Sequence, residues 1–423
     1  MHVVILGNGI TGVTVARHLR KASPDVKITI VSGESDHHWS RPALMYIYMG
    51  HMRYQDTRPY EDHFWADNRI GLRRGWVKRI DLDAHQLQFE DGTSMAWDKL
   101  VLATGSVPNR FGWPGQDLDR VQGMYSLQDL ISLERATPLL RRVVIVGGGL
   151  IGIEMAEMLH SRHIPVTMLV REDLYWNNVL PTEESAMVGR AIARAGIDLR
   201  LKTELVEIHD DEKGGVAGVT TSTGERIDCD LVGLTAGVRP NTQMAAASGI
   251  PTKRGILVDE WLKTSIPDVY AAGDCAQIAH SDGEHYGEQV WYSGRAQGEV
   301  LAGNILGADV PYKRGIWFNS AKFLHVEYQT YGTVPSKPQD GISSLYWEHA
   351  DGNRSVRLVH RAGTFVGANV MGLRLRHRVC EKWIAEEQPL SYVIEHFTEA
   401  GFDGEFDRRH AKTAQAALHG MAS

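Results

Sequence analysis

Two short glycine-rich segments, each placed between an apolar strand and a helix, constrain this fold more than any other feature. The first is Gly7-Asn8-Gly9-Ile10-Thr11-Gly12, which follows the apolar residues 2–6. In a G-x-G-x-x-G turn the first glycine permits the tight turn, the second lets the backbone approach a pyrophosphate, and the third lets helix and strand pack closely. The N-terminus of the helix also favours the phosphate charge. We therefore expect Gly7, Gly9 and Gly12 to hold a dinucleotide.

The same pattern returns about 140 residues later. Gly147-Gly148-Gly149-Leu150-Ile151-Gly152 follows an expected strand at 143–146 and precedes a helix expected to end near residue 162. One such match also fits a tight strand–helix turn that binds nothing. Two copies, each followed by a helix and a second strand, favour two dinucleotides, and Gly147, Gly149 and Gly152 are expected to hold the second.

Length and element order predict an α/β fold with more than one domain. The chain has 423 residues, of which 43% are hydrophobic and 23% charged, enough for two or three cores. We expect two Rossmann-like nucleotide-binding domains, at 1–112 with 242–311 and at 113–241. Strands expected at 328–332, 343–347, 356–360 and 364–370, and the helices after them, predict a third, α+β domain at 312–423 that serves as an interface or dimerisation domain.

Composition excludes several classes of function. The net charge of −7 gives no reason to expect a nucleic-acid partner. The three cysteines, Cys229, Cys275 and Cys380, form no closely spaced pair, which argues against a disulfide framework and a metal site. Few cysteines and no recognisable signal peptide predict a cytoplasmic location. The most apolar stretch, 143–159, contains three consecutive glycines and two glutamates, so no membrane span is expected.

Three further motifs occur in the order found in a known family. They are Ala103-Thr104-Gly105, Leu234-Thr235-Ala236-Gly237-Val238-Arg239-Pro240-Asn241 and Tyr270-Ala271-Ala272-Gly273-Asp274-Cys275. With the two glycine loops they resemble the two-dinucleotide-binding, pyridine nucleotide-disulfide oxidoreductase-like flavoproteins, over residues 1–335. The resemblance is to the rubredoxin, nitrite and ferredoxin reductase branch, which has no redox-active disulfide.

The resemblance implies a cofactor for each nucleotide-binding domain. The first domain would bind FAD, with Asp274 hydrogen-bonded to the ribityl chain or the phosphate edge. The second would bind NADH or NADPH as the electron donor. The family motifs imply further cofactor contacts at Thr104, Gly105, Gly237 and Gly273.

An acidic residue after the second strand of such a unit usually binds a ribose hydroxyl. In the first unit the candidate is Glu34, and the alternative is a solvated turn glutamate. In the second unit Val170 stands at the expected position, followed by Arg171 and Glu172. Arg171 would pair with a 2′-phosphate and favour NADPH, whereas Glu172 would serve NADH if Arg171 is simply exposed.

Residues 40–44 resemble the segment that lies beside the flavin in this branch. Arg41 is a candidate flavin or pyrophosphate contact, and the alternative is a surface arginine. Ala43 stands about where disulfide reductases carry a redox cysteine. Tyr46 stands near the place of a lysine in ferredoxin reductases and would face the flavin ring, which puts a Lys–Glu pair at the flavin in doubt.

Two residues are assigned to the reaction centre by the resemblance. Glu154 would lie near the flavin N5 and the nicotinamide carboxamide, where partial desolvation would raise its pKa. The alternative is a first-turn glutamate stabilised by the helix dipole. Trp291 would precede the helix that points at the flavin pyrimidine carbonyl, and the alternative is core packing.

The sequence therefore predicts an FAD-dependent oxidoreductase that accepts hydride from NAD(P)H. Because no internal thiol relay is present, electrons are expected to pass to a separate acceptor such as a rubredoxin, a ferredoxin or a partner subunit. Two alternatives stay open, an NAD(P)H oxidase that reduces oxygen and a low-turnover flavin-binding sensor or assembly protein. A homodimer is expected from the interface-like third domain.

Overall fold

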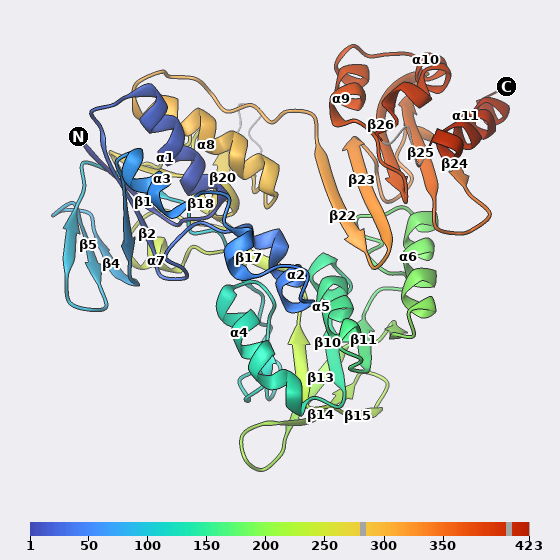
Figure 1. The fold of residues 1–423 in the computed structure, drawn as a ribbon, viewed down its shortest axis with the longest axis horizontal. Coiled ribbons are helices and arrows are strands. Elements are labelled where there is room, and N and C mark those ends of the chain that lie inside the picture. The colour runs from blue at the N-terminus through green and yellow to red at the C-terminus, as the bar shows by residue number, and fades with distance from the viewer. Residues whose placement is uncertain (280–284, 403–407, 423) are drawn as a thin grey trace. The chain divides into compact units, whose positions relative to one another are not determined.

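The computed structural model describes residues 1–279, 285–402 and 408–422, and the chain forms two compact units (Figure 1). Unit 1 comprises Met1–Asn109, Met124–Thr137 and Gly237–Arg314, and unit 2 comprises Arg110–Gly123, Pro138–Ala236 and Gly315–Ser423. Each unit therefore contains one of the two glycine loops. The domain boundaries expected from the sequence stay a prediction.

Unit 1 is built on a five-stranded parallel sheet. β1 (His2–Leu6) lies at its centre between β2 (Lys27–Ser32) and β7 (Lys99–Leu102), with β3 (Ile70–Arg74) and β19 (Val269–Ala271) at the edges. All four pairs are parallel, so the carboxyl ends of the strands meet at one edge of the sheet. The inner strands β1, β2 and β7 are almost entirely buried, because both faces of such a sheet are covered.

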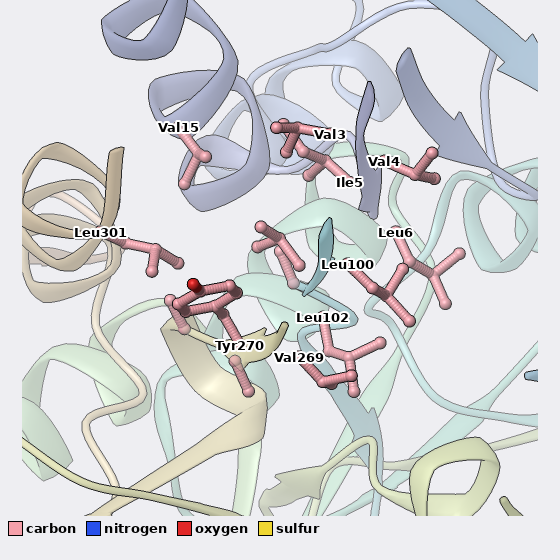
Figure 2. Close-up of a cluster of buried hydrophobic side chains, with 14 of the residues drawn as sticks. Val3, Val4, Ile5, Leu6, Val15, Leu100, Leu102, Val269, Tyr270 and Leu301 are labelled. Carbon is pink, nitrogen blue, oxygen red and sulfur yellow. The ribbon is translucent and has the colours of Figure 1, made fainter. Parts of the chain in front are cut away.

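Two helices cover one face of this sheet. α1 (Ile10–Ala22) joins β1 to β2, and α8 (Trp291–Ile305) packs beside it (Figure 1). Figure 2 shows Val15 of α1 and Leu301 of α8 directed at the side chains of β1, β7 and β19. Both residues are fully buried, and burying such a side chain stabilises the fold by about 1.5–3 kcal/mol.

The α8 helix begins earlier than its sequence suggests. The sequence predicts a helix around 295–305, whereas the structure begins the helix at Trp291 and so includes Gly294, a residue of low helix propensity. A Cβ atom at Gly294 would lie 2.6 Å from the Thr11 hydroxyl of α1. The glycine thus permits close packing of the two helices, and this packing outweighs the local propensity.

Smaller elements complete unit 1. Three small sheets pair β4 with β5 and β6, β8 with β17, and β18 with β20 and β21. Their bounds, with those of the remaining helices, are β4 (Val77–Asp81), β5 (Gln86–Phe89), β6 (Ser94–Ala96), β8 (Ser106–Pro108), β17 (Val238–Pro240), β18 (Ile256–Val258), β20 (Ala276–Ala279), β21 (His285–Tyr286), α2 (Leu44–Tyr48), α3 (Asp62–Asp67), α4 (Leu127–Ala136) and α7 (Gln243–Ala247), with 3-10 turns at Arg41–Ala43, Tyr54–Thr57 and Gly273–Cys275.

The first part of unit 2 repeats the same topology. β10 (Val143–Val146) lies between β11 (Val166–Val170) and β16 (Leu231–Leu234), with β12 (Asp198–Leu201) and β9 (Val121–Gln122) at the edges of this parallel sheet. The accompanying elements are α5 (Leu150–Ser161), α6 (Thr182–Arg194) and the antiparallel strands β13 (Leu205–Asp210), β14 (Val216–Thr221) and β15 (Arg226–Asp228). Each glycine loop thus follows the central strand of a parallel sheet and precedes a helix.

The C-terminal part of unit 2 is an antiparallel sheet with helices on one face. Its strand order is β22, β23, β26, β25, β24. The bounds are β22 (Phe318–Phe323), β23 (Val326–Gly332), β24 (Ser343–Glu348), β25 (Ser355–Arg361), β26 (Thr364–Met371), α9 (His377–Ala385), α10 (Leu390–Glu395) and α11 (Arg408–Ala422). The strands expected from the sequence are present, and β22 is an additional edge strand.

On the other face of this C-terminal sheet, a buried ion pair joins β25 to α6. Arg357 of β25 donates to Glu184 through Nε at 2.7 Å and Nη2 at 2.8 Å. Nη2 also donates to Glu183 at 2.7 Å. The Glu184 side chain is fully buried and that of Arg357 is 9% exposed. The carboxylate therefore depends on the arginine for its charge compensation.

Removing the arginine should destabilise unit 2. In Arg357→Met the Glu184 charge stays buried without its partner, and we expect a loss of about 3–5 kcal/mol. Urea unfolding monitored by circular dichroism measures this loss. The exposed Arg200→Met variant serves as the control, and Arg357→Met with Glu184→Met should recover most of the stability. Equal stability of Arg357→Met and Arg200→Met would contradict the assignment.

Candidate functional site

In the first glycine loop, two glycines lie against backbone carbonyl groups and the third does not. Gly7 has φ +121°, and a Cβ atom there would overlap the Ala103 carbonyl. A Cβ atom at Gly12 would overlap the carbonyl of Gly7. A Cβ atom at Gly9, by contrast, would meet no atom within 4 Å. Internal packing therefore does not explain Gly9, which leaves open space above the N-terminus of α1.

The second loop repeats this arrangement within unit 2. Gly147 has φ +124°, and its Cβ atom would lie 2.6 Å from the Thr235 carbonyl oxygen. At Gly152 the Cβ atom would lie 2.7 Å from the carbonyl oxygen of Gly147. At Gly149 the nearest atom would be Nε1 of Trp176, at 4.0 Å. Both loops thus keep their middle glycine open, as a backbone that approaches a ligand requires.

Neither helix that follows a loop is capped by a side chain. Gly9 is the N-cap of α1 and Gly149 that of α5, and neither first turn contains an acidic residue. The first N–H groups of a helix have no partner within the helix and carry a partial positive charge. Each loop therefore offers the chemistry that binds a phosphate group.

Two of the polar residues expected to contact the first cofactor, Glu34 and Arg41, bind each other. Arg41 donates to both carboxylate oxygens of Glu34, at 2.9 and 2.6 Å. Its guanidinium also lies 5.0 Å from the ring of Trp39 and 4.7 Å from that of Tyr125. Glu34 further accepts from the backbone N–H of Leu127, at the start of α4. The ion pair thus ties the segment after β2 to α4.

Asp274 lies in a polar cluster at the end of β19. Its Oδ2 accepts from the Ser106 hydroxyl at 3.0 Å, and Gln289 donates to the same hydroxyl at 3.0 Å. The Ser106 backbone N–H donates to the hydroxyl of Tyr125 at 3.2 Å. Burial raises the pKa of Asp274, although the Ser106 hydroxyl and the Arg41 charge oppose this shift. Ser106 and Tyr125 were not expected from the sequence.

The remaining family motifs are joined by hydrogen bonds within unit 1. Thr104 donates through its hydroxyl to the Asn241 carbonyl at 2.8 Å, and the Asn241 N–H donates to Gly105 at 2.9 Å. Gly105 and Gly237 have φ +69° and +83°, in the region that favours glycine. The Gly273 N–H donates to Gln297 of α8 at 2.7 Å. These bonds fix the backbone around Asp274.

Tyr46 and Trp291, the two aromatic side chains expected to lie at the flavin, are both partly exposed to solvent. Tyr46 of α2 is half-buried, and its ring lies 6.0 Å from that of His51. Trp291, the first residue of α8, is 38% exposed and packs edge-on against Tyr292. This exposure makes core packing a poor explanation for Trp291. Flavin contacts at both positions stay predictions.

Glu154 has the perturbed carboxyl expected from the sequence. It lies on α5 and is half-buried. Burial, with a smaller contribution from the neighbouring Glu157 carboxylate, raises the pKa of Glu154 to about 7. Tyr175, which sequence reasoning missed, donates to the Gly149 carbonyl at 2.7 Å and also interacts with the Glu154 charge. Helix periodicity could not reveal a tyrosine from the segment after β11.

The end of β11 leaves both donor hypotheses open. Val170 is buried and packs against Gly148. Arg171 is 73% exposed and pairs with Glu172 at 2.8 Å. The arginine and the carboxylate therefore lie together at the position where a Rossmann unit recognises the ribose or its 2′-phosphate.

The first loop is also held by residues that the sequence did not single out. Asn8 donates through Nδ2 to the Ser35 carbonyl and hydroxyl oxygens, both at 3.0 Å. His38 Nδ1 lies 2.8 Å from the Asn8 carbonyl oxygen, and burial lowers the pKa of this histidine. A neutral imidazole therefore donates to the loop and limits its movement.

Two negative findings concern the described residues. In this part of the chain no helix combines the length and hydropathy that a membrane span needs. The same residues contain no group of three or more His, Cys, Asp or Glu side chains suited to a metal ion.

Comparison with known proteins identifies several relatives. The pyridine nucleotide-disulphide oxidoreductase family matches residues 1–298. Rhodocoxin reductase of Rhodococcus erythropolis is 29% identical, covering 99% of this chain and 96% of that protein. The ferredoxin–NAD(+) reductase component of the biphenyl dioxygenase system of Paraburkholderia xenovorans is 30% identical over 73% of this chain and 76% of its own length. The crystal structure of the ferredoxin reductase for the CYP199A2 system from Rhodopseudomonas palustris matches with a TM-score of 0.79 at 27% identity, covering 88% of this chain and 91% of that chain.

The raised pKa of Glu154 should make stability depend on pH. The folded value of about 7 exceeds the ordinary value of 4.5, so the unfolded chain releases this proton first. The contribution of Glu154 to stability is therefore greatest below pH 4.5 and falls as pH rises toward 7. Glu154→Gln lacks this dependence. The difference between the melting temperatures of Glu154→Gln and the native protein should therefore change with pH. From pH 5 to pH 8 it should move in favour of Glu154→Gln by roughly 2 °C or more. If calorimetry finds the same difference in melting temperature at both pH values, the raised pKa of Glu154 is contradicted.

Proposed function

The chain belongs to the pyridine nucleotide-disulphide oxidoreductase family, and on this premise we propose an FAD-dependent reductase that takes hydride from NADH or NADPH. The electrons pass to a separate small redox protein of the ferredoxin or rubredoxin kind. Two of the relatives are a rhodocoxin reductase and a ferredoxin–NAD(+) reductase component. Rhodocoxin reductase aligns with nearly the whole of this chain, so the proposal concerns the chain as a whole.

The pair of open glycine positions supports this proposal most strongly. Gly9 and Gly149 each leave free space at the N-terminus of a helix that follows the central strand of a parallel sheet. In each loop the flanking glycines are required by close backbone contacts, whereas the middle one is not. Two such sites in one chain suit two dinucleotides, one kept as a cofactor and one exchanged as a substrate.

We assign the first site to FAD. Bound there, flavin would accept a hydride and release electrons singly or in pairs. The loop from Gly7 to Gly12 would bind the pyrophosphate. Asp274, oriented by Ser106, would accept hydrogen bonds from hydroxyl groups of the cofactor. Glu34 would contribute to the same site through its position beside Arg41.

We assign the second site to the nicotinamide donor. The loop from Gly147 to Gly152 would bind its pyrophosphate, and Glu154 would contact the carboxamide. A carboxyl group with a pKa of about 7 can both donate and accept hydrogen bonds near neutral pH. Glu172 favours NADH and Arg171 favours NADPH, so the donor is determined by which of the two meets the ribose.

The cysteines support an external acceptor. Cys229, Cys275 and Cys380 are free and buried. Cys229 lies between β15 and β16, Cys275 in the 3-10 turn Gly273–Cys275 and Cys380 in α9. Burial raises the pKa of Cys229 and of Cys380 to about 12 and also raises that of Cys275. Such thiols are poor nucleophiles and cannot form a dithiol relay. The homodimer and the cytoplasmic location expected from the sequence stay predictions.

Anaerobic reduction of the purified protein tests the proposal. A yellow protein should lose its visible flavin absorbance when NADH or NADPH is added, and the more effective donor identifies the dinucleotide. On admission of air the flavin should reoxidise slowly, and an added ferredoxin should accelerate this step. Fast reoxidation in air without a partner would indicate an oxidase. A protein that contains no flavin and does not bind added FAD would refute the proposal.

The two glycine loops should have separable roles. Gly9→Val places a side chain in the first open site without a clash inside the protein, so we expect a folded protein whose FAD affinity falls at least about tenfold. Gly149→Val should keep its flavin but resist reduction by the donor. Gly189→Val, where a Cβ atom also meets no neighbour, is the control. Flavin absorbance and stopped-flow reduction measure both effects. Normal reduction of Gly149→Val would contradict the second assignment.

A further inference from the structure

We propose that Lys322 is a positioning residue for Glu154, because its ion pair with Glu157 controls how much negative charge Glu154 faces. The C-terminal sheet would thereby influence the nicotinamide site through one lysine. This inference rests on the proposed function, in which Glu154 contacts the dinucleotide.

The two glutamates lie on the same face of α5. Glu154 and Glu157 are three residues apart, a spacing that brings side chains of a helix together. The Glu157 side chain is 11% exposed. Its Oε2 is buried and has no hydrogen-bond partner among the described residues. A charge in this setting is only partly solvated, and a nearby cation compensates it.

That cation is Lys322 of β22. Its Nζ donates to Oε1 of Glu157 at 2.7 Å. The ion pair joins residues 165 positions apart, so it exists only because the C-terminal sheet packs on α5 within unit 2. Lys322 is also attracted by Glu327 of β23, but Glu327 forms its own ion pair with Arg374.

Among the described residues, Glu157 is the charged group that acts on the pKa of Glu154. Of the strands that pack most extensively against α5, β10 and β11 contain no titratable side chain, while β22 contains Lys322. Tyr175, in the segment after β11, contributes a hydroxyl near Glu154. The charge of Glu154 therefore depends mainly on burial and on Glu157, whose charge Lys322 balances.

Loss of the lysine has a defined consequence. Without Lys322 the Glu157 charge would be uncompensated, and its repulsion of the Glu154 carboxylate would increase. The pKa of Glu154 would then rise above its present value of about 7. At neutral pH the carboxyl group would be mostly protonated, and it would act mainly as a hydrogen-bond donor to the carboxamide.

The test is a pH titration of the full-length protein labelled with ¹³C at the glutamate carboxyl carbon. The resonance missing from Glu154→Gln identifies Glu154. Lys322→Met should raise its titration midpoint by at least about half a pH unit, and Lys322→Arg should keep the native midpoint. Glu157→Gln, alone or with Lys322→Met, should lower the midpoint below the native value. In each variant, the midpoint of the pH profile of flavin reduction should shift in the same direction as the titration midpoint of Glu154.

Lys382→Met is the matched control, since Lys382 pairs with Glu386 on an exposed part of α9. Lys322→Gln provides a second variant if Lys322→Met does not fold. An unchanged midpoint in Lys322→Met and in Lys322→Gln, or an equal change in Lys382→Met, would overturn the inference. The carboxyl titration needs no flavin, so a native protein without flavin would refute the proposed function and leave this test intact.

Discussion

The close approach of strand and helix backbones at each glycine loop is the constraint on which the structure depends. A side chain at Gly7 would overlap the backbone at the end of β7, and one at Gly12 would overlap the loop itself. The chain can therefore pass from the central strand to the helix only through glycine. The same tight turn leaves the helix N-terminus uncovered at Gly9, so the packing requirement and the proposed binding site have one cause.

Buried charges supply a second level of organisation. Glu34, Glu157 and Glu184 each meet an arginine or lysine: Arg41, Lys322 and Arg357. Two of these pairs connect segments more than 160 residues apart. Removing one partner from such a pair costs far more than the pair itself contributes to stability. These contacts therefore specify which segments pack together.

Glu154 and Glu157 lie on the same helix but differ in whether a cation is paired with the carboxyl group. No ion pair among the described residues involves Glu154, and burial raises its pKa to about 7. Glu157, one helical turn later, is paired with a lysine. One face of a helix thus carries one carboxyl group with a pKa near neutrality and one that is held in an ion pair.

The sequence by itself determined the two strand–loop–helix units, the order of the motifs that follow them and the alternating strands of the C-terminal sheet. These features depend on neighbouring residues, because glycine spacing and hydrophobic periodicity are local properties of the chain. Only the tertiary structure decided that Arg41 binds Glu34 and stacks on Tyr125, 84 residues away, and that Lys322 reaches Glu157. It also decided the start of α8, where contact with α1 outweighs the helix propensity of Gly294. Burial and charge pairing depend on segments distant in the chain, and no local sequence pattern predicts which of these segments will be in contact.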